Sequence, residues 1–293
     1  MDTGRNHSWA PASVSQADAE RAPPILEVHD LTCRFGGVVA VNRCSFSIER
    51  GRITGVIGPN GAGKTTIFRM VAGALAPSSG RILFEGEDIT GVPTHEMFHR
   101  GIVRTFQIPH EFGRLTTLEN LMTVPSGQPG ENLWRVWASP GRIRNHEAGV
   151  REKAERTLEF LNLSGLRDEL AMNLSGGQKK LLELGRAMMT EPRLALLDEP
   201  GAGVNPTLLA SLAEMIRTLN RERNYTFVII EHDMDLIASL CDRVIVLAEG
   251  AVLTEGTMDK VREDPRVIEA YLGGGDEADE AVESKASIGS ASE

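Results

Sequence analysis

The sequence predicts an α/β protein built on a mostly parallel β-sheet that is covered on both faces. The first observation is a series of short, nearly continuous runs of Leu, Ile and Val, typical of strands buried on both sides. The second is that segments with helical periodicity lie between these runs, as in sheets whose parallel strands are joined by helices. The expected strands are 25–28, 46–48, 53–57, 81–84, 194–197, 226–230 and 244–247.

Helices are expected where apolar residues recur every three or four positions. The faces of this kind are Ala154, Leu158 and Leu161 in one segment and Leu208, Leu212, Met215 and Leu219 in another. Residues from about 108 to 172 break the strand–helix alternation and are mainly helical by pattern. We interpret this stretch as an inserted helical subdomain.

Both ends of the chain are expected to lie outside the folded domain. Residues 1–24 are rich in Ala, Ser, Pro and Asp, and residues 273–293 are rich in Gly, Ala, Ser and acidic side chains. Such compositions bury too little apolar surface to order a segment. The expected domain therefore spans residues 25–272, between a disordered N-terminal extension and a disordered acidic tail.

The composition is that of an ordinary globular protein. Of the 293 residues, 41% are hydrophobic and 25% are charged, so a hydrophobic core can form without disulfides. The three cysteines, Cys33, Cys44 and Cys241, form no CxxC pair. This pattern argues against a disulfide framework and a zinc ribbon, and it predicts buried thiols.

Charge and hydropathy exclude further classes. No stretch approaches the roughly 18 apolar residues of a membrane span, and residues 1–21 lack the apolar run of a secretory signal peptide. We therefore expect a chain that is soluble by itself and reaches a membrane only through a partner. The net charge of −10, half of it in the tail, disfavours a nucleic-acid-binding protein, which usually presents a basic face.

Residues 58–65 match the phosphate-binding pattern GxxxxGK[ST], directly after the expected strand 53–57 and before a helical run from Thr66 to Ala74. Glycines let consecutive backbone N–H groups point at phosphate oxygens, and the start of the next helix adds partial positive charge. Lys64 is predicted to neutralise the outer phosphates and Thr65 to ligate Mg²⁺. The predicted phosphate-binding residues are Gly58, Pro59, Asn60, Gly61, Ala62, Gly63, Lys64, Thr65 and Thr66.

Two carboxylates, Asp198 and Glu199, close the apolar strand that begins at Leu194. In a phosphate-binding sheet, the first can hold Mg²⁺ through its water shell and the second can polarise a water for attack on the γ-phosphate. Both would lie at the carboxyl edge of the sheet beside the glycine loop, where open parallel sheets bind ligands. The alternative is an exposed acidic turn before Pro200.

The sequence Leu174-Ser175-Gly176-Gly177-Gln178 precedes an expected helix over 179–189. Ser175 is a good N-cap, and the two glycines expose the first amides of the helix. An anion can bind at such a helix start, which predicts a second phosphate site. The residues alone are equally consistent with a capped helix and nothing more.

Five motifs occur together in this chain. They are the phosphate loop, Arg104-Thr105-Phe106-Gln107, Leu174-Ser175-Gly176-Gly177-Gln178, Leu196-Leu197-Asp198-Glu199-Pro200 and Ile230-Glu231-His232-Asp233-Met234. In this combination and order, roughly residues 25–272 resemble the ATP-binding subunit of ABC transporters. The resemblance implies a P-loop nucleotide hydrolase fold with a mostly parallel core sheet, an antiparallel β edge and an inserted helical subdomain, and it implies ATP and Mg²⁺ as ligands.

The resemblance also assigns roles to single residues. It implies that Phe35 stacks on adenine, that Gln107 senses Mg²⁺ and the attacking water, that Glu199 is the general base and that His232 touches the γ-phosphate. Without it, Phe35 would be interpreted as a core aromatic and Gln107 as a strand amide. It further implies that each ATP is sandwiched between the phosphate loop of one subunit and the Ser175–Gln178 motif of another, so that the working unit is a dimer.

Finer features are similar to the larger ATPase subunit of branched-chain amino acid importers. They are Arg34-Phe35-Gly36-Gly37, Val39-Ala40-Val41, Val103-Arg104-Thr105-Phe106-Gln107, the insertion with Trp134 and Trp137, Gly203-Val204-Asn205-Pro206 and the terminal Val267–Gly273. Lys179, Lys180 and Gly185 are mild departures from the family's signature helix. The resemblance leaves the transported solute open, because similar sequence motifs also occur in ATPase subunits for amide and urea uptake.

The implied partners are a second ATPase subunit, two transmembrane permease subunits and, indirectly, a periplasmic or extracellular solute-binding protein. Family habit favours a sister ATPase subunit over an identical one, at the cytoplasmic face of the cell membrane. The segment Ile108–Phe112 and the helical subdomain are the expected contact with a permease helix; the alternative is a structural loop.

Three other function classes share single features with this sequence. His95-Glu96-Met97-Phe98-His99 spells the zinc-protease pattern HExxH, and Glu119 could be nominated as a third ligand. The family instead has a short surface helix at this position. A soluble ABC ATPase of DNA repair or translation is disfavoured by the absence of coiled-coil heptads and of a second cassette, while the ATPase subunit of an exporter stays open.

Overall fold

The computed structural model of the chain describes residues 23–105, 111–124 and 140–272. Gln107, residues 108–110, Trp134, Trp137, residues 1–22 of the N-terminal extension and the acidic tail lie outside these ranges.

A six-stranded sheet forms the centre of the molecule, with the strand order β10-β9-β3-β8-β7-β6. All neighbouring pairs are parallel except β9 with β10. The strands are β3 (Ile53–Ile57), β6 (Ile102–Arg104), β7 (Leu194–Asp198), β8 (Thr226–Ile230), β9 (Arg243–Ala248) and β10 (Ala251–Gly256). Because β3, β8 and β7 are adjacent and parallel, the segments that follow them leave the sheet at the same edge.

The side chains of the central strands alternate between two cores. Leu194 and Leu196 of β7 belong to one hydrophobic cluster, while Ala195 and Leu197 belong to another. The first cluster lies against α2 (Lys64–Val71) and the antiparallel sheet, and the second against α7 (Gly176–Met189), α8 (Pro206–Arg223) and α9 (Met234–Leu240). The prediction of a sheet buried on both faces is therefore confirmed.

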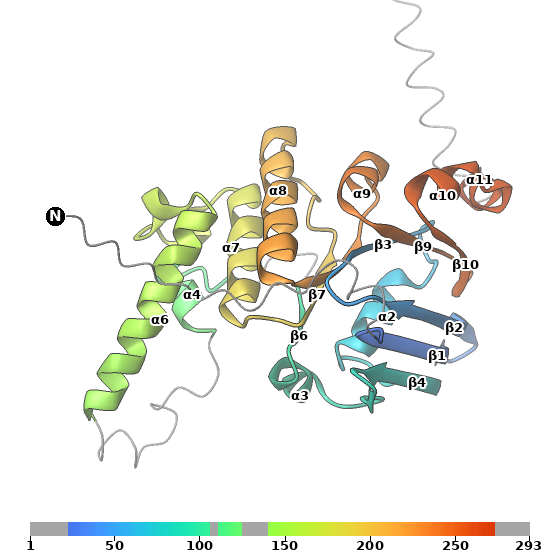
Figure 1. The fold of residues 1–293 in the computed structure, drawn as a ribbon, viewed down its shortest axis with the longest axis horizontal. Helices are drawn as coiled ribbons and strands as arrows, with labels where there is room; N and C mark the ends of the chain where they lie inside the picture. Colours follow the sequence, from blue (N-terminus) through green and yellow to red (C-terminus); the bar gives the residue numbers. More distant parts are fainter. Residues whose placement is uncertain (1–22, 106–110, 125–139, 273–293) are drawn as a thin grey trace, which may run out of the picture.

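A second, antiparallel sheet has the strand order β2-β1-β4-β5. Its strands are β1 (Leu26–Phe35), β2 (Val38–Ile48), β4 (Ser79–Phe84) and β5 (Glu87–Asp88). Figure 1 shows β1, β2 and β4 beside α2, on the opposite side of the molecule from the helical layer. This sheet is the antiparallel edge that the resemblance implied.

The helical layer is formed by α4 (Thr117–Met122), α6 (Pro140–Phe160) and α7, which pack on one another (Figure 1). Two short 3₁₀ turns, Ser164–Leu166 and Ala171–Asn173, connect α6 to α7. The remaining helices are α3 (Thr94–His99), α10 (Met258–Glu263) and α11 (Pro265–Leu272). Among the helices that the structure describes, none has the length and apolarity needed to cross a bilayer.

The expected strands lie within observed strands except for Ile25, which precedes β1 by one residue, and the sequence does not predict β5, β6 and β10. The first two are only two and three residues long, and β10 is a partly exposed edge strand, so none shows a run of buried apolar residues. The helix expected over 66–74 starts earlier, at Lys64, and ends at Val71. It ends there because Gly73 takes a φ of +69°, a left-handed conformation that terminates helices.

Candidate functional site

The phosphate loop connects β3 to α2 through glycines that no other residue could replace without strain. Gly58, Gly61 and Gly63 have φ values of +148°, +79° and +95°. A Cβ on Gly58 would lie 2.1 Å from the backbone oxygen of Leu247, and one on Gly63 would lie 2.6 Å from that of Ala40. The loop therefore packs between β9 and the β1–β2 hairpin, and its exposed residues are Asn60, Gly61 and Thr65.

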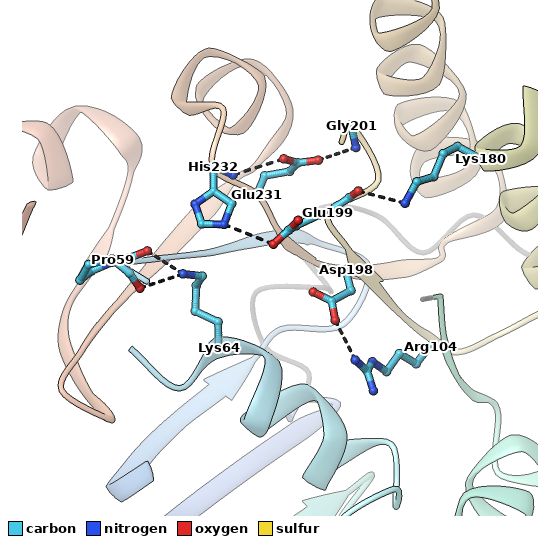
Figure 2. Close-up of polar contacts among 10 residues, drawn as sticks. Pro59, Lys64, Arg104, Lys180, Asp198, Glu199, Gly201, Glu231 and His232 are labelled. Carbon is cyan, nitrogen blue, oxygen red and sulfur yellow. Dashed lines mark hydrogen bonds and ion pairs between the residues drawn. The ribbon is translucent and has the colours of Figure 1, made fainter. Parts of the chain in front are cut away.

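The ammonium group of Lys64 closes this loop from the first turn of α2. Its Nζ donates to the backbone oxygens of Gly58 and Pro59, at 2.6 and 3.0 Å (Figure 2). Burial lowers the pKa of Lys64, and the nearby carboxylates of Glu199 and Asp198 act in the opposite direction. No side chain of the described residues caps the start of α2, and no acidic residue lies in its first turn. A buried cation beside an uncapped helix start fits a phosphate.

Asp198, at the end of β7, has a buried carboxylate in which only one of the two oxygens is paired within the described residues. Its side chain is 1% exposed, and Oδ2 accepts a hydrogen bond from Nη2 of Arg104 at 2.7 Å. Within the described ranges, Oδ1 is buried and has no hydrogen-bond partner. An unpaired carboxylate oxygen is costly to bury, and oxygen is the ligand atom that Mg²⁺ prefers. The residue therefore fits the magnesium prediction.

Glu199 follows in an unusual backbone conformation that turns the chain toward the loop. Its φ is +49°, and its N–H donates to the backbone oxygen of Ile230 at 2.9 Å. The Oε1 atom lies 3.3 Å from Nε2 of His232 (Figure 2). A carboxylate placed in this way can accept a proton from a water, and the neighbouring imidazole can orient it.

Lys64, Glu199 and His232 line one cleft of about 290 Å³, whereas Asp198 is not among its lining residues. Its lining consists of Ala40, the loop and helix residues from Asn60 to Thr66, Glu199 and His232. The sheet order explains the meeting, because the three segments follow the adjacent strands β3, β7 and β8. The structure thus brings together the predicted phosphate loop, the predicted base and the predicted γ-phosphate contact, and the alternative of an exposed acidic turn at residues 198–199 is wrong.

Glu231 is a functional candidate that the sequence reasoning did not single out. It is 5% exposed, and its Oε1 accepts from the N–H of Gly201 at 2.5 Å while Oε2 accepts from the N–H of His232 at 3.2 Å. Burial raises the pKa of Glu231, against the effect of these two N–H groups. The signal in the sequence was an acidic residue directly after the apolar strand 226–230.

Ser175, Gly176, Gly177 and Gln178 do not line this cleft. Ser175 is the N-cap of α7, as predicted, since its Oγ accepts from the N–H of Gln178 at 3.3 Å. The Oε1 atom of Gln178 accepts from the N–H of Ser175 at 2.9 Å, which completes a capping box. Within one chain, this motif is a capped helix start outside the cleft that the phosphate loop lines.

Phe35 lies at the end of β1 and is 48% exposed. Its interpretation as a core aromatic is therefore wrong. Its ring is free to stack, although it does not line the cleft, to which its hairpin contributes Ala40.

The HExxH residues form α3, whose Met97 is buried while His95 and Glu96 are exposed. Glu119 belongs to a different helix, where it forms a capping box with Thr116. In the described part of the chain, no three His, Cys, Asp or Glu side chains are grouped to hold a metal ion. The thiols of Cys33 and Cys44 are buried and that of Cys241 is partly buried.

Comparison with known families decides what this site belongs to. A family model described as "ABC transporter" matches residues 41–202, and a model described as "Branched-chain amino acid ATP-binding cassette transporter" matches residues 251–277. The chain belongs to the ABC transporter family. Within the family, it is an ATP-binding protein of the branched-chain amino acid transport type, and thus an ATP-hydrolysing cassette.

Curated relatives match this cassette over most of its length. It is 45% identical over 252 residues to the probable branched-chain amino acid transport ATP-binding protein LivG of Archaeoglobus fulgidus, covering 86% of this chain and 96% of the relative. It is 42% identical over 250 residues to the high-affinity branched-chain amino acid transport ATP-binding protein BraF of Pseudomonas aeruginosa, covering 85% and 98%.

Solved structures share the fold. A nucleotide-free ATP-binding cassette from an ABC transporter superposes with a TM-score of 0.74 at 39% identity, over 85% of this chain and 99% of that one. The ADP conformation of an ABC transporter cassette superposes with a TM-score of 0.72 at 37% identity, over 86% and 100%. The predicted ABC cassette fold is confirmed.

Proposed function

We propose that this cassette energises an importer of branched-chain amino acids, working at the cytoplasmic face of a cell membrane. The observation that carries the proposal is the match of residues 251–277 to the branched-chain amino acid group. These residues cover β10, α10 and α11, outside the nucleotide cleft, so the match is independent of the motifs shared by ABC ATPases in general. The printed names of the relatives agree with it.

For hydrolysis, we assign the phosphates of ATP to the loop Gly58–Thr66, with Lys64 neutralising their outer charge. Thr65 and Asp198 would hold Mg²⁺, together with Gln107. When bound, the ion would neutralise charge that develops on the phosphate oxygens. The unpaired Oδ1 of Asp198 supports this assignment.

Glu199 would take the proton from the attacking water, because its carboxylate lines the cleft opposite the loop. His232, at 3.3 Å from that carboxylate, would orient it and contact the γ-phosphate. Phe35 would stack on adenine, which its exposed ring supports.

A second cassette is part of the proposal. Ser175–Gln178 sits at an exposed start of α7 away from the cleft of its own chain, so its amides would reach only the nucleotide of another subunit. Two chains would close over ATP and separate after hydrolysis, since ATP binds better to the closed pair.

The permease contact is assigned to an apolar cavity of about 260 Å³ where β6, α3 and α7 meet. Phe98, Ile102, Val103 and Arg186 are among its lining residues. The nearby ring of Phe112 is exposed, with the guanidinium of Arg186 at 5.1 Å from its centroid. A permease helix would place apolar side chains in this cavity.

Uptake in a deletion strain tests the proposed solute. Loss of the gene should abolish high-affinity uptake of radiolabelled leucine, isoleucine and valine, and the wild-type chain should restore it while Glu199→Gln should not. Unchanged uptake of these amino acids with loss of amide or urea uptake would instead assign the cassette to that related solute class. Co-purification of two membrane subunits with the tagged chain tests the proposed partners.

A further inference from the structure

The segment Glu199–Gly201 is held between two buried charged side chains. From α7, Nζ of Lys180 donates to the backbone oxygen of Glu199 at 3.2 Å. From the end of β8, the carboxylate of Glu231 accepts from the N–H of Gly201 at 2.5 Å. Figure 2 shows the two side chains reaching the segment from opposite directions.

The segment needs support because its conformation is unfavourable. Glu199 has a φ of +49°, in the left-handed region that a residue with a Cβ enters at an energetic cost. Gly201 approaches Glu231 so closely that a Cβ there would lie 2.8 Å from Oε1. The native backbone is therefore stable only if its surroundings hold it.

Contact with a bound nucleotide does not explain why the charged groups of Lys180 and Glu231 are buried. Lys180 is 7% exposed and Glu231 is 5% exposed, and neither lines the cleft. A buried ion is costly, and well-packed apolar residues are often as stable in its place. Both side chains form hydrogen bonds with the backbone of the segment Glu199–Gly201. This contact suggests that they fix the position of Glu199 and do not serve stability alone.

We propose that Lys180 and Glu231 are positioning residues that hold the backbone of Glu199 so that its carboxylate faces the cleft. The proposal rests on the assignment of Glu199 as the base. Lys180 also lies on the helix that begins at the Ser175 motif. A shift of α7 would therefore move the carbonyl of Glu199, so the contact links that motif to the base of the same chain.

The test is steady-state hydrolysis by the full-length chain in its purified transporter complex, with binding of a fluorescent ATP analogue measured in parallel. Lys180→Met keeps the volume and removes the donor. Turnover should fall about tenfold, the scale of one lost hydrogen bond to a charged group. The nucleotide dissociation constant should change by less than about twofold, since Lys180 does not reach the cleft. Lys180→Arg, which keeps a charged donor, should recover most of the turnover.

Lys260 provides the control. It is exposed on α10 and does not line the cleft. Lys260→Met should leave basal turnover within about twofold of wild type. A second variant, Glu231→Gln, keeps an acceptor for Gly201 and loses one for His232, so turnover should fall by about threefold to tenfold with unchanged nucleotide affinity.

The failures of the two proposals can be distinguished. Normal turnover of Glu199→Gln would overturn the assignment of the base itself. If Glu199→Gln is inactive while Lys180→Met and Glu231→Gln turn over normally, only the positioning proposal is overturned. A second result also overturns it. If Lys180→Met lowers turnover, nucleotide affinity and the thermal midpoint together, and Lys180→Arg restores neither turnover nor affinity, then Lys180 only stabilises the fold.

Discussion

The phosphate loop and the Ser175 motif are both glycine-containing starts of helices, yet only the phosphate loop lines the cleft with Glu199 and His232. At the phosphate loop, α2 starts without a side-chain cap, and a lysine, a base and an imidazole converge on the same cleft. At the Ser175 motif, α7 starts with a complete capping box, and Ser175–Gln178 do not line that cleft.

The difference follows from where each helix lies relative to the sheet. The phosphate loop leaves the carboxyl edge of β3, next to the ends of β8 and β7, so groups distant in sequence meet there. The Ser175 motif follows a 3₁₀ turn in the helical layer, and its residues do not line the cleft. The comparison teaches that the groups lining the cleft come together within one chain, whereas the Ser175 motif contributes to a nucleotide site only through the second subunit that we propose.

The largest expected effect is on ATP hydrolysis at the cleft that the phosphate loop and Glu199 line. Glu199→Gln should reduce ATP hydrolysis by a factor on the order of 100 or more, because a positioned base is removed. Nucleotide binding should be retained, as seen by equilibrium dialysis. Glu249→Gln is the matched control, since Glu249 also follows a parallel strand with a positive φ of 50° but does not line the cleft. Near-wild-type turnover of Glu199→Gln would refute the role.

Lys64→Ala should weaken ATP binding by about tenfold to hundredfold, because charge-assisted hydrogen bonds to the phosphates are lost. Isothermal titration of the isolated chain measures this change. Lys260→Ala, at an exposed position of α10, should leave the affinity unaltered. An unchanged affinity of Lys64→Ala would contradict the assignment of the phosphates to this loop.

Ser175→Ala sharpens the comparison by separating binding from turnover. The isolated chain should bind ATP with an affinity within about twofold of wild type, because the motif lies outside its own cleft. Turnover of the assembled transporter should fall about tenfold if the motif contacts the nucleotide of a second subunit. Loss of the N-cap should also cost about 1 kcal/mol of stability, so the thermal midpoint is measured alongside. Weaker ATP binding by the isolated, folded chain would show that the Ser175 motif contributes to the nucleotide site of its own chain.

The smallest effect concerns the two glycines of the Ser175 motif. A Cβ on Gly177 would lie 2.2 Å from Cδ2 of Leu208, whereas nothing lies within 4 Å of a Cβ on Gly176. Gly177→Ala should therefore lower the free energy of unfolding by about 1 kcal/mol through crowding at the start of α8. Denaturant titration of both variants checks this, with Gly176→Ala as the control. Equal stabilities would show that Leu208 moves aside freely.

Much of this fold could be predicted because the core strands are long and apolar. The sequence predicts strand β7 together with Asp198 and Glu199, because an apolar run that ends in two acidic residues is a local pattern within a few consecutive positions. Strand β6 could not be predicted, because three residues carry no periodicity. The exposure of Phe35 is expected from the family resemblance but not from the residue pattern alone, since an aromatic residue in a strand usually belongs to the core.

The sequence by itself determined the phosphate loop, the pair Asp198 and Glu199, and the N-cap of α7, because each depends on neighbours within a few residues. Only the tertiary structure decided that β8 separates β3 from β7, which places His232 3.3 Å from Glu199. It also decided that Lys180 and Glu231 close on the same turn of backbone. The physical reason is that hydrogen bonds act over a few ångströms, while these partners are separated along the chain by whole helices and strands.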